Sequence, residues 1–303
     1  MTQTDDPIRA RAERRLKRRE TLASYLFLAP YLVLLCMFGV FPVFYAFGLS
    51  FFDTIEGAFY GLANYQFILA DFRLPRATVN VLSFVVQWVT LTVLGVTAIS
   101  LLLDDIARRA ATTLRTIVFL PGALISSALV VVWLFILDPL VSPFGPVLGL
   151  AGWTSLQTVV AGVGYATIFA VMAFFATSGG WVVVIGGALS SLPVEVKEAA
   201  RVDGAKPWQL ALRIKLPMIW RSIVLMAILS FAAGIQIFVE PQLMGLAGAQ
   251  FTQSDWSLNQ LAFQYAFRMG DFGASAALST VLVGISLAIA LVIIFVTKFY
   301  KTD

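Results

Sequence analysis

Six long apolar runs dominate the pattern of hydrophobic and polar positions along this chain. The runs lie at about residues 22–52, 78–103, 113–137, 158–189, 217–245 and 274–299. Each run reaches the length of about 20 apolar residues that an α-helix needs to cross a bilayer. The pattern therefore predicts six membrane-spanning helices and an all-α membrane protein.

The fourth run, residues 158–189, is long enough to raise a second interpretation. It contains Thr177, Ser178, Gly179 and Gly180, which could form a tight turn between two spans. No turn with polar ends is visible at this place. We therefore favour a single helix that is tilted or kinked.

A low content of charged residues supports the membrane assignment. Hydrophobic residues make up 59% of the 303 residues and charged residues only 13%, whereas about a quarter of a soluble protein is charged. The mean hydropathy is +0.88, so much of the surface must meet lipid. The length suits one polytopic domain at 22–299, between a basic segment at 1–21 and a short tail at 300–303.

The basic residues are distributed asymmetrically between the two sides of the predicted membrane domain. With the N-terminus in the cytoplasm, 18 of the 21 Lys and Arg residues fall on the cytoplasmic side, and only Arg73, Arg76 and Arg268 fall outside. Cytoplasmic loops carry such an excess of basic residues. We therefore expect six spans, with both termini and the segment 190–217 in the cytoplasm.

The most basic stretch, "IRARAERRLKRRE", precedes the first apolar run. A cleaved signal peptide needs a short apolar core and a small-residue cleavage site, and this run fits neither requirement. We therefore expect an uncleaved first span. A basic segment could bind nucleic acid, but beside a membrane span the anionic lipid leaflet is the favoured partner, and we expect no nucleic acid.

Several classes of chemistry are excluded by residue types that this sequence lacks. The chain has no histidine and a single cysteine, Cys36, inside an apolar run. Catalytic triads with histidine, histidine-ligated metals and disulfides are therefore impossible within it. The G-x-x-x-x-G-K-[ST] phosphate loop is absent as well, so this polypeptide does not hydrolyse ATP by that route.

The segment 190–217, between the fourth and fifth apolar runs, is charged and helix-prone. Ser190 and Ser191 are suited to cap a helix, and Pro193 fits its first turn. Glu195 would lie near the positive end of the helix dipole. The pattern predicts a short helix at the start of the segment.

A glycine divides this charged segment. Gly204 is suited to end the first helix, because glycine adopts a positive φ without steric cost, and Lys206-Pro207-Trp208 is suited to begin a second. The segment is predicted to be helix, glycine turn and helix at the cytoplasmic membrane face. It could be a solvated loop, a helix resting on the headgroups, or a docking surface for a cytoplasmic partner.

The same segment contains a spaced motif: Glu-Ala-Ala at 198–200, glycine at 204 and Ile-Lys-Leu-Pro at 214–217. In this motif and its spacing the chain resembles the membrane subunits of binding-protein-dependent ABC importers. In that family the segment is a coupling helix that fits a cleft of a separate ATPase. The resemblance implies that the ATPase-coupling residues are Glu198, Ala199, Ala200, Asp203, Gly204, Ala205, Ile214, Leu216 and Pro217.

Four further stretches, at 26–53, 61–80, 114–139 and 238–244, resemble the sugar-importer branch of the family, which includes the maltose- and glycerol-phosphate-type permeases. The resemblance implies a type I importer permease fold in a bacterial or archaeal cytoplasmic membrane. It also implies a second permease subunit, two copies of an ATPase that bind ATP and magnesium, and an extracytoplasmic solute-binding protein. This chain would bind no cofactor or metal and would not be an enzyme.

Polar residues inside the spans are candidates for the substrate path, because burying them in lipid is costly. Gln236 and Glu240, one turn apart and on the same face of the helix predicted for the fifth run, could bind substrate hydroxyls, although Glu240 could also be solvated or paired. Asn80 and Gln87 in the second run are further candidates, but helix-to-helix hydrogen bonds explain them as well.

Two other functions were weighed against an importer permease. A secondary transporter that works alone would show inverted repeats and intramembrane ionisable residues, and Glu240 is the one candidate of that kind. A membrane-embedded enzyme is disfavoured, because the sequence lacks histidine and clustered carboxylates. The pattern favours the permease and keeps the stand-alone carrier as the alternative.

Overall fold

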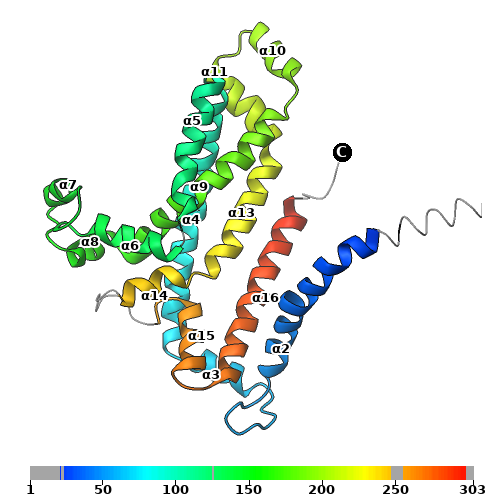
Figure 1. Ribbon diagram of the computed structural model, residues 1–303, viewed down its shortest axis with the longest axis vertical. Helices are drawn as coiled ribbons and strands as arrows, with labels where there is room; N and C mark the ends of the chain where they lie inside the picture. The colour runs from blue at the N-terminus through cyan, green and yellow to red at the C-terminus, as the bar shows by residue number, and fades with distance from the viewer. Residues whose placement is uncertain (1–20, 22–23, 125, 247–254, 298–303) are drawn as a thin grey trace, which may run out of the picture.

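The fold was obtained as a computed structural model that describes residues 21, 24–124, 126–246 and 255–297. Over these ranges the regular elements are helices, joined by turns and by one isolated bridge between Phe52 and Phe59. Long helices lie side by side, and a lateral arm made of α6 to α8 leaves them near their middle (Figure 1). The predicted all-α class is confirmed.

Five helices of the described chain are long and apolar enough to cross a membrane. They are Ser24–Leu49, Arg73–Asp104, Tyr165–Ser190, Trp220–Leu246 and Phe272–Phe295. The first contains the π-helical turn η1 (Cys36–Val40) and α2 (Phe41–Leu49), and the second and third are α4 and α9. The last belongs to α16 (Phe272–Thr297). A sixth span is present if one bent pair of helices is counted as a single span.

That bent pair replaces the straight helix that residues 113–137 predict. Helix α5 (Arg108–Phe119) is followed by the 3₁₀ turn η2 (Leu120–Ala123), and α6 (Ser126–Leu137) then departs at an angle of 101°. Pro121 and Gly122 lie at the bend. Proline lacks the backbone N–H that a helical hydrogen bond needs, and glycine has a low helix propensity. The helix therefore breaks at these two residues.

The fourth run contains one candidate span, Tyr165–Ser190, and not the two spans of the second interpretation, but a separate short helix precedes it. Helix α8 (Leu156–Val163) ends at Gly164, whose φ of 84° is incompatible with a right-handed helix, and α9 (Tyr165–Ser190) follows. Residues 177–180 lie within α9 and form no turn. Helices α6, α7 (Gly145–Leu150) and α8 make up the lateral arm (Figure 1).

The fifth run is interrupted at both ends. The motif residues at its start, Leu216 and Pro217, lie in the short helix α12 (Leu216–Met218), and α13 (Trp220–Ile235) begins after Ile219. A second break follows α13, and α14 (Val239–Leu246) completes the run. The fifth run is therefore built from three successive helices, α12, α13 and α14.

The core lies where α4 packs against α9 and α13. Phe84 and Trp88 of α4 stack at 5.6 Å between ring centroids, and Phe169 of α9 is fully buried beside them. A separate hydrophobic cluster joins α3 (Ala63–Ala70), α15 (Leu258–Phe267) and α16 around Tyr265. The first helix, by contrast, has none of its apolar window buried, as expected of a helix that faces lipid or another subunit.

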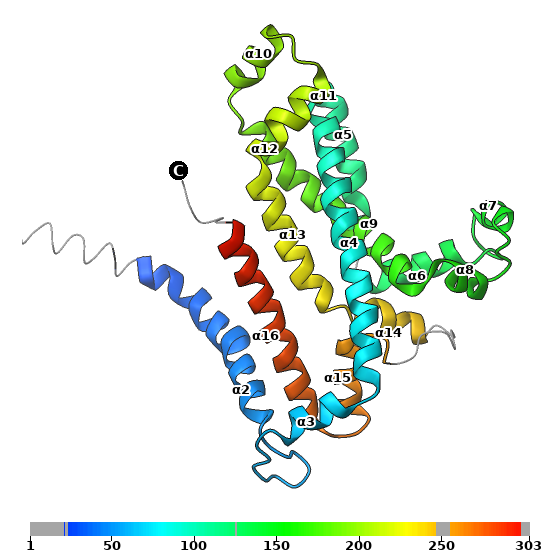
Figure 2. The ribbon, with the colours of Figure 1, turned by 180° about the vertical axis from the view of Figure 1, so that it is seen from behind.

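Helix α4 runs through the molecule between two ends. The short helices α10 (Val194–Val202) and α11 (Pro207–Gln209) form one tip, and α3 and α15 lie at the opposite end (Figures 1 and 2). This arrangement defines the two surfaces at which functional residues gather.

Candidate functional site

The charged segment 190–217 folds as helix, glycine turn and helix, and this prediction is confirmed. Helix α10 is followed by Gly204 with φ 79°, and the amide of Ala205 donates to the carbonyl of Ala200 at 3.0 Å. The chain then continues through α11, the π-helical turn η3 (Leu210–Lys215) and α12. Glycine is required at 204 because a side chain is strained at this φ.

The serines before α10 do not cap it, so that part of the prediction is wrong. Ser190 donates to the carbonyl of Gly186 and Ser191 to that of Ala188, both at 2.8 Å. These bonds belong to the last turn of α9, where local hydroxyl-to-carbonyl bonds compete with capping. Pro193 is the residue before α10, and Glu195 lies in its first turn as expected.

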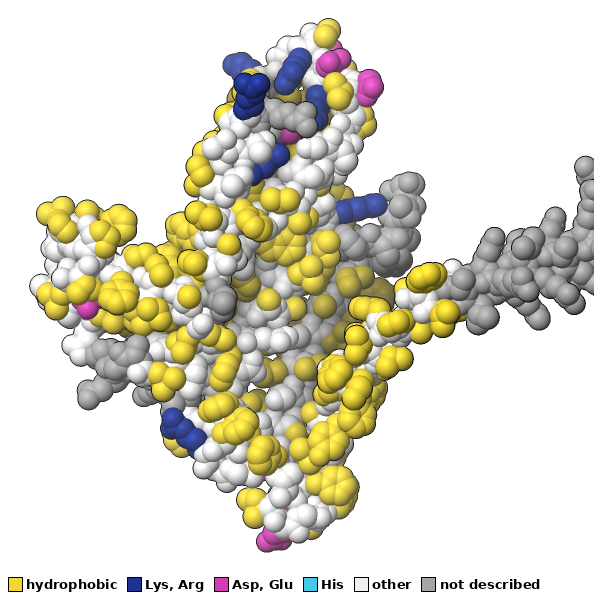
Figure 3. All heavy atoms as spheres, viewed as in Figure 1, with side chains coloured by type: hydrophobic (Ala, Val, Ile, Leu, Met, Phe, Trp, Pro, Cys, Tyr) yellow, Lys and Arg dark blue, Asp and Glu magenta, His cyan; other side chains and the backbone are white. Residues whose placement is uncertain are grey.

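Most motif residues of this segment are accessible at the tip. Ala200 is buried, whereas Ala205, Ile214 and Leu216 are half-buried; the exposed ones are Glu198, Ala199, Asp203, Gly204 and Pro217. Large apolar side chains at Val202, Trp208 and Leu212 are exposed among them. Figure 3 shows basic and acidic side chains gathered at this tip, whereas hydrophobic side chains dominate the helices below. A surface that mixes apolar and charged side chains is suited to a protein partner.

Two lysines fix this segment to the ends of the long helices. Lys215 has a side chain only 1% exposed, and its Nζ lies 2.8 Å from Asp104 Oδ2 and 2.5 Å from Asp105 Oδ1. Lys197 Nζ donates to the carbonyl of Leu189 at 3.0 Å and lies 3.7 Å from Asp104 Oδ2. Burial lowers the pKa of Lys215, but the hydrogen bonds to the two carboxylates outweigh it, so the net pKa is raised. The ammonium is therefore charged.

A polar groove of about 530 Å³ lies along the other half of α4. Asn80 and Gln87 both line it, together with Arg76, Val79 and Ser83 of α4, the chain at 163–167 and Trp256. Thr167 donates to Gln87 Oε1 at 2.8 Å, and Asn80 Nδ2 donates to the carbonyl of Trp256 at 3.2 Å. The structure thus brings Asn80 and Gln87 to one groove. Gln87 also makes the helix-to-helix hydrogen bond that was its alternative explanation, between α4 and α9, whereas Asn80 bonds to the turn before α15.

The other pair, Gln236 and Glu240, does not share a helical face, contrary to our prediction. Gln236 caps the end of α13, and Glu240 lies in the first turn of α14. Residues 236–238 separate the two helices. Gln236 is exposed, Glu240 is half-buried, and neither lines the groove of Asn80 and Gln87. A role for them in the substrate path stays a prediction.

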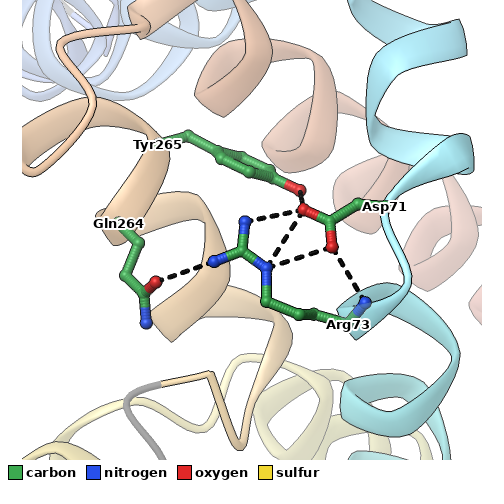
Figure 4. A network of polar contacts seen from close by, with 4 residues as sticks. All are labelled: Asp71, Arg73, Gln264 and Tyr265. Carbon is green, nitrogen blue, oxygen red and sulfur yellow. Dashed lines mark hydrogen bonds and ion pairs between the residues drawn. The ribbon is translucent and has the colours of Figure 1, made fainter.

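A buried polar network at the end of the molecule opposite the tip was not predicted. Arg73 Nη2 lies 2.7 Å from Asp71 Oδ2, the Tyr265 hydroxyl donates to the same oxygen at 2.7 Å, and Arg73 Nη1 donates to Gln264 at 3.0 Å (Figure 4). The sequence "DFR" before a long apolar run is the local signal for the first pair. Nothing local indicates Tyr265 or Gln264.

This network shifts the protonation of two groups. Hydrogen bonds from the Arg73 side chain are the main cause that lowers the pKa of Asp71 to about 2. Burial raises the pKa of Tyr265, and its bond to the ionised Asp71 raises it further. The ion pair of Asp71 and Arg73, with its hydrogen bonds to Tyr265 and Gln264, joins the loop before α4 to α15. This geometry favours a structural role over proton transfer.

The part of the chain that the structure describes contains no cluster of three acidic, cysteine or histidine residues suited to hold a metal ion. The membrane-spanning helices, the exposed tip and the polar groove suit a protein of transport and partner binding. The comparison with known structures agrees. A chain of a bacterial ABC transporter involved in the import of the acidic polysaccharide alginate has the same fold, with a TM-score of 0.81 over 96% of this chain and 100% of that chain, at 18% identity.

This chain therefore shares the fold of an ABC importer chain. The family of binding-protein-dependent transport system inner membrane components matches residues 92–301, and the chain belongs to this family. The resemblance inferred from the motif is confirmed. The protein is a membrane component of a transport system and not an enzyme.

Two relatives of established name are similar over most of their length. The alpha-glucoside transport system permease protein AglF of Rhizobium meliloti is 27% identical over 287 residues, 89% of this chain and 81% of the relative. The trehalose/maltose transport system permease protein MalF of Thermococcus litoralis is 25% identical over 294 residues, 95% of this chain and 97% of the relative.

Proposed function

We propose that this chain forms half of the translocation pore of an ATP-driven importer and that its solute is a carbohydrate. The names of its relatives, permeases for alpha-glucosides and for trehalose and maltose, support this substrate class. The family name supports delivery of the solute by an extracytoplasmic binding protein. The second half of the pore would be a related permease subunit.

The observation that carries this proposal is the tip at residues 190–217. It places exposed Glu198 and Asp203 beside exposed apolar side chains, on short helices held to α4 by buried charges. Since the chain has no phosphate loop, ATP must be hydrolysed on another polypeptide. Two copies of an ABC ATPase, which bind ATP and magnesium, would dock here through Glu198, Gly204 and the other motif residues. The same surface would lie in the cytoplasm with both termini.

The groove beside α4 is a candidate part of the substrate path. Asn80, Gln87 and Thr167 offer amide and hydroxyl groups, which suit the hydroxyls of a sugar. Tyr165 and Trp256 also line it, and aromatic rings bind the apolar faces of sugar rings. A neutral, hydroxyl-rich solute would find both kinds of contact in this hollow.

A purification test separates this proposal from the stand-alone carrier. The chain is expressed with its neighbouring transport genes, purified in mild detergent, and every co-purifying polypeptide is identified by mass. We expect an ATPase with a phosphate loop and a second permease, and a photo-cross-linker at position 198 should join the ATPase. The same cross-linker at Phe72, which is exposed at the opposite end, should not.

The alternative has an equally specific signature in this experiment. A stable, monodisperse chain with no ATPase, and with no adduct at position 198 in intact membranes, would favour a secondary transporter. An ATPase without a second permease would instead support an importer whose pore is a homodimer.

A further inference from the structure

Helix α4 connects the polar groove to the tip formed by α10 and α11. It runs without interruption over 32 residues, Arg73–Asp104, which is about 48 Å at 1.5 Å per residue. Asn80 and Gln87 line the groove from its first half, and Asp104 closes its last turn at the tip. Its packing against α9 and α13 buries much of its length, so a displacement of one end is transmitted to the other.

The cytoplasm-proximal end of α4 has an unusual charge pattern. Asp104 and Asp105 lie at the C-terminus of the helix, where the helix dipole is negative and acidic side chains are disfavoured. The ammonium of Lys215 compensates both carboxylates at 2.8 and 2.5 Å. Lys197, from α10, lies near Asp104 as well. Both lysines come from the segment 190–217, so this charge cluster joins the coupling segment to α4.

Burial strengthens the ion pairs of Lys215 with Asp104 and Asp105 and fixes their position. A lysine side chain that is 1% exposed is rarely tolerated unless it is paired. Removal of one partner would leave an uncompensated buried charge. Lys215 is also close in sequence to the motif residues Ile214, Leu216 and Pro217. A movement of the coupling segment therefore carries α4 with it for as long as this ion pair is intact.

We propose that Lys215 is the positioning residue that transmits movement of the coupling segment to the groove, through Asp104, Asp105 and α4. The inference rests on the proposed function, since it requires an ATPase at the tip. When the ATPases move the segment 190–217, the ammonium holds the end of α4 to it, and the residues Asn80 and Gln87 shift with the helix. Lys215 itself need not touch the ATPase or the solute.

The test uses the whole importer with a variant that neutralises Lys215 and both of its carboxylate partners, while Lys197 keeps its hydrogen bond to the carbonyl of Leu189. Lys215→Met, Asp104→Asn and Asp105→Asn are combined, because neutral replacement of all partners avoids the cost of a buried lone charge. Arg268→Met, an exposed residue at the opposite end, is the control for loss of a basic residue. Lys215→Arg tests whether a cation alone is sufficient.

Four quantities are measured: the ATPase retained after purification, ATP hydrolysis with and without solute-loaded binding protein, uptake in vesicles, and the signal of a fluorescent label in the groove. A fluorescent label at position 79 reports on the groove in a Cys36→Ser background, because Cys36 is the only cysteine. We expect the triple variant to keep the ATPase and its basal hydrolysis. Uptake should fall at least tenfold, and the change in label signal on addition of a non-hydrolysable ATP analogue should disappear. Lys215→Arg should retain most of the uptake, and Arg268→Met all of it.

Two results would overturn the inference while the proposed function stands. One is a triple variant with normal uptake and a normal label response. The other is a triple variant that no longer retains the ATPase, because Lys215 would then only build the docking surface. If the unaltered chain recruits no ATPase, the proposed function is contradicted, and the inference about Lys215 is contradicted with it.

Discussion

The hydroxyl of Tyr265 donates a hydrogen bond of 2.7 Å to Oδ2 of Asp71, from 194 positions further along the chain. This bond and the pair Asp71–Arg73 join the loop before α4 to α15 (Figure 4). The network lies at the end of α4 opposite the lysine cluster of Lys215. Buried polar groups thus fix both ends of the same helix.

The free energy of unfolding should depend on pH through the protonation of Asp71. Its pKa is lowered to about 2, so its carboxylate contributes fully above the unfolded pKa of about 4, and this contribution is lost as the pH falls towards 2. The shift corresponds to roughly 2 kcal/mol. Thermal unfolding of the detergent-solubilised protein between pH 5 and 2.5 should show the loss. Asp71→Asn should be less stable at pH 6 and should lack this part of the acid dependence.

Two adjacent glycines of α9, Gly179 and Gly180, should differ sharply in how well they tolerate substitution by a larger residue. A methyl group at Gly179 would lie 2.6 Å from the carbonyl oxygen of Val118, whereas one at Gly180 would meet nothing within 4 Å. Gly179→Val should therefore separate α9 from α5 and cost about 3 kcal/mol or more. Gly180→Val should leave the yield of folded protein and its melting temperature nearly unchanged. Equal behaviour of the two variants in size-exclusion chromatography would contradict the close packing of α5 on α9.

The glycine turn of the coupling segment should be essential for uptake and dispensable for membrane insertion. Gly204 has φ 79° and its amide donates to the carbonyl of Arg201 at 3.1 Å. Gly204→Pro cannot adopt this φ and removes the donor, and Glu198→Lys reverses an exposed charge. Each should abolish uptake at a normal membrane content, measured by immunoblot. Gly187→Ala, in the open helical surface of α9, is the control, and normal uptake in the first two variants would end the coupling hypothesis.

The groove and the α13–α14 break offer competing positions for solute contact. If the groove is part of the path, Asn80→Ala and Gln87→Ala should each raise the KM of uptake about 5- to 20-fold, as expected for one or two lost hydrogen bonds. Gln236→Ala, outside the groove, should have little effect. The reverse ranking in a transport assay would move the path to Gln236 and Glu240.

The direction of the chain in the membrane is also testable. In the Cys36→Ser background, a cysteine at Glu56, in the loop between α2 and α3, should react with a membrane-impermeant reagent in intact cells. A cysteine at Val202, exposed at the tip, should react only after the membrane is opened. Labelling of Val202 in intact cells would contradict a cytoplasmic coupling segment.

The all-α membrane class, the family and the spacing of the Glu-Ala-Ala motif could be read from the sequence alone. Apolar length is set by the thickness of the bilayer, so the runs could be read without tertiary information. The turn at Gly204 could be predicted for a similar reason, because the positive φ that ends the first helix is a property of one residue and its neighbours. The spacing of Glu198, Gly204 and Pro217 is likewise a one-dimensional pattern.

Only the tertiary structure decided where long runs break and which distant residues meet. Composition cannot distinguish a straight helix from one broken at Gly164, because both bury a similar apolar length. The serines at 190 and 191 were misassigned because their hydroxyls bond to the preceding turn. The contacts of Lys215 with Asp104 and of Tyr265 with Asp71 join segments more than 100 positions apart. Such pairs are set by the packing of whole helices, which no local pattern in the sequence specifies.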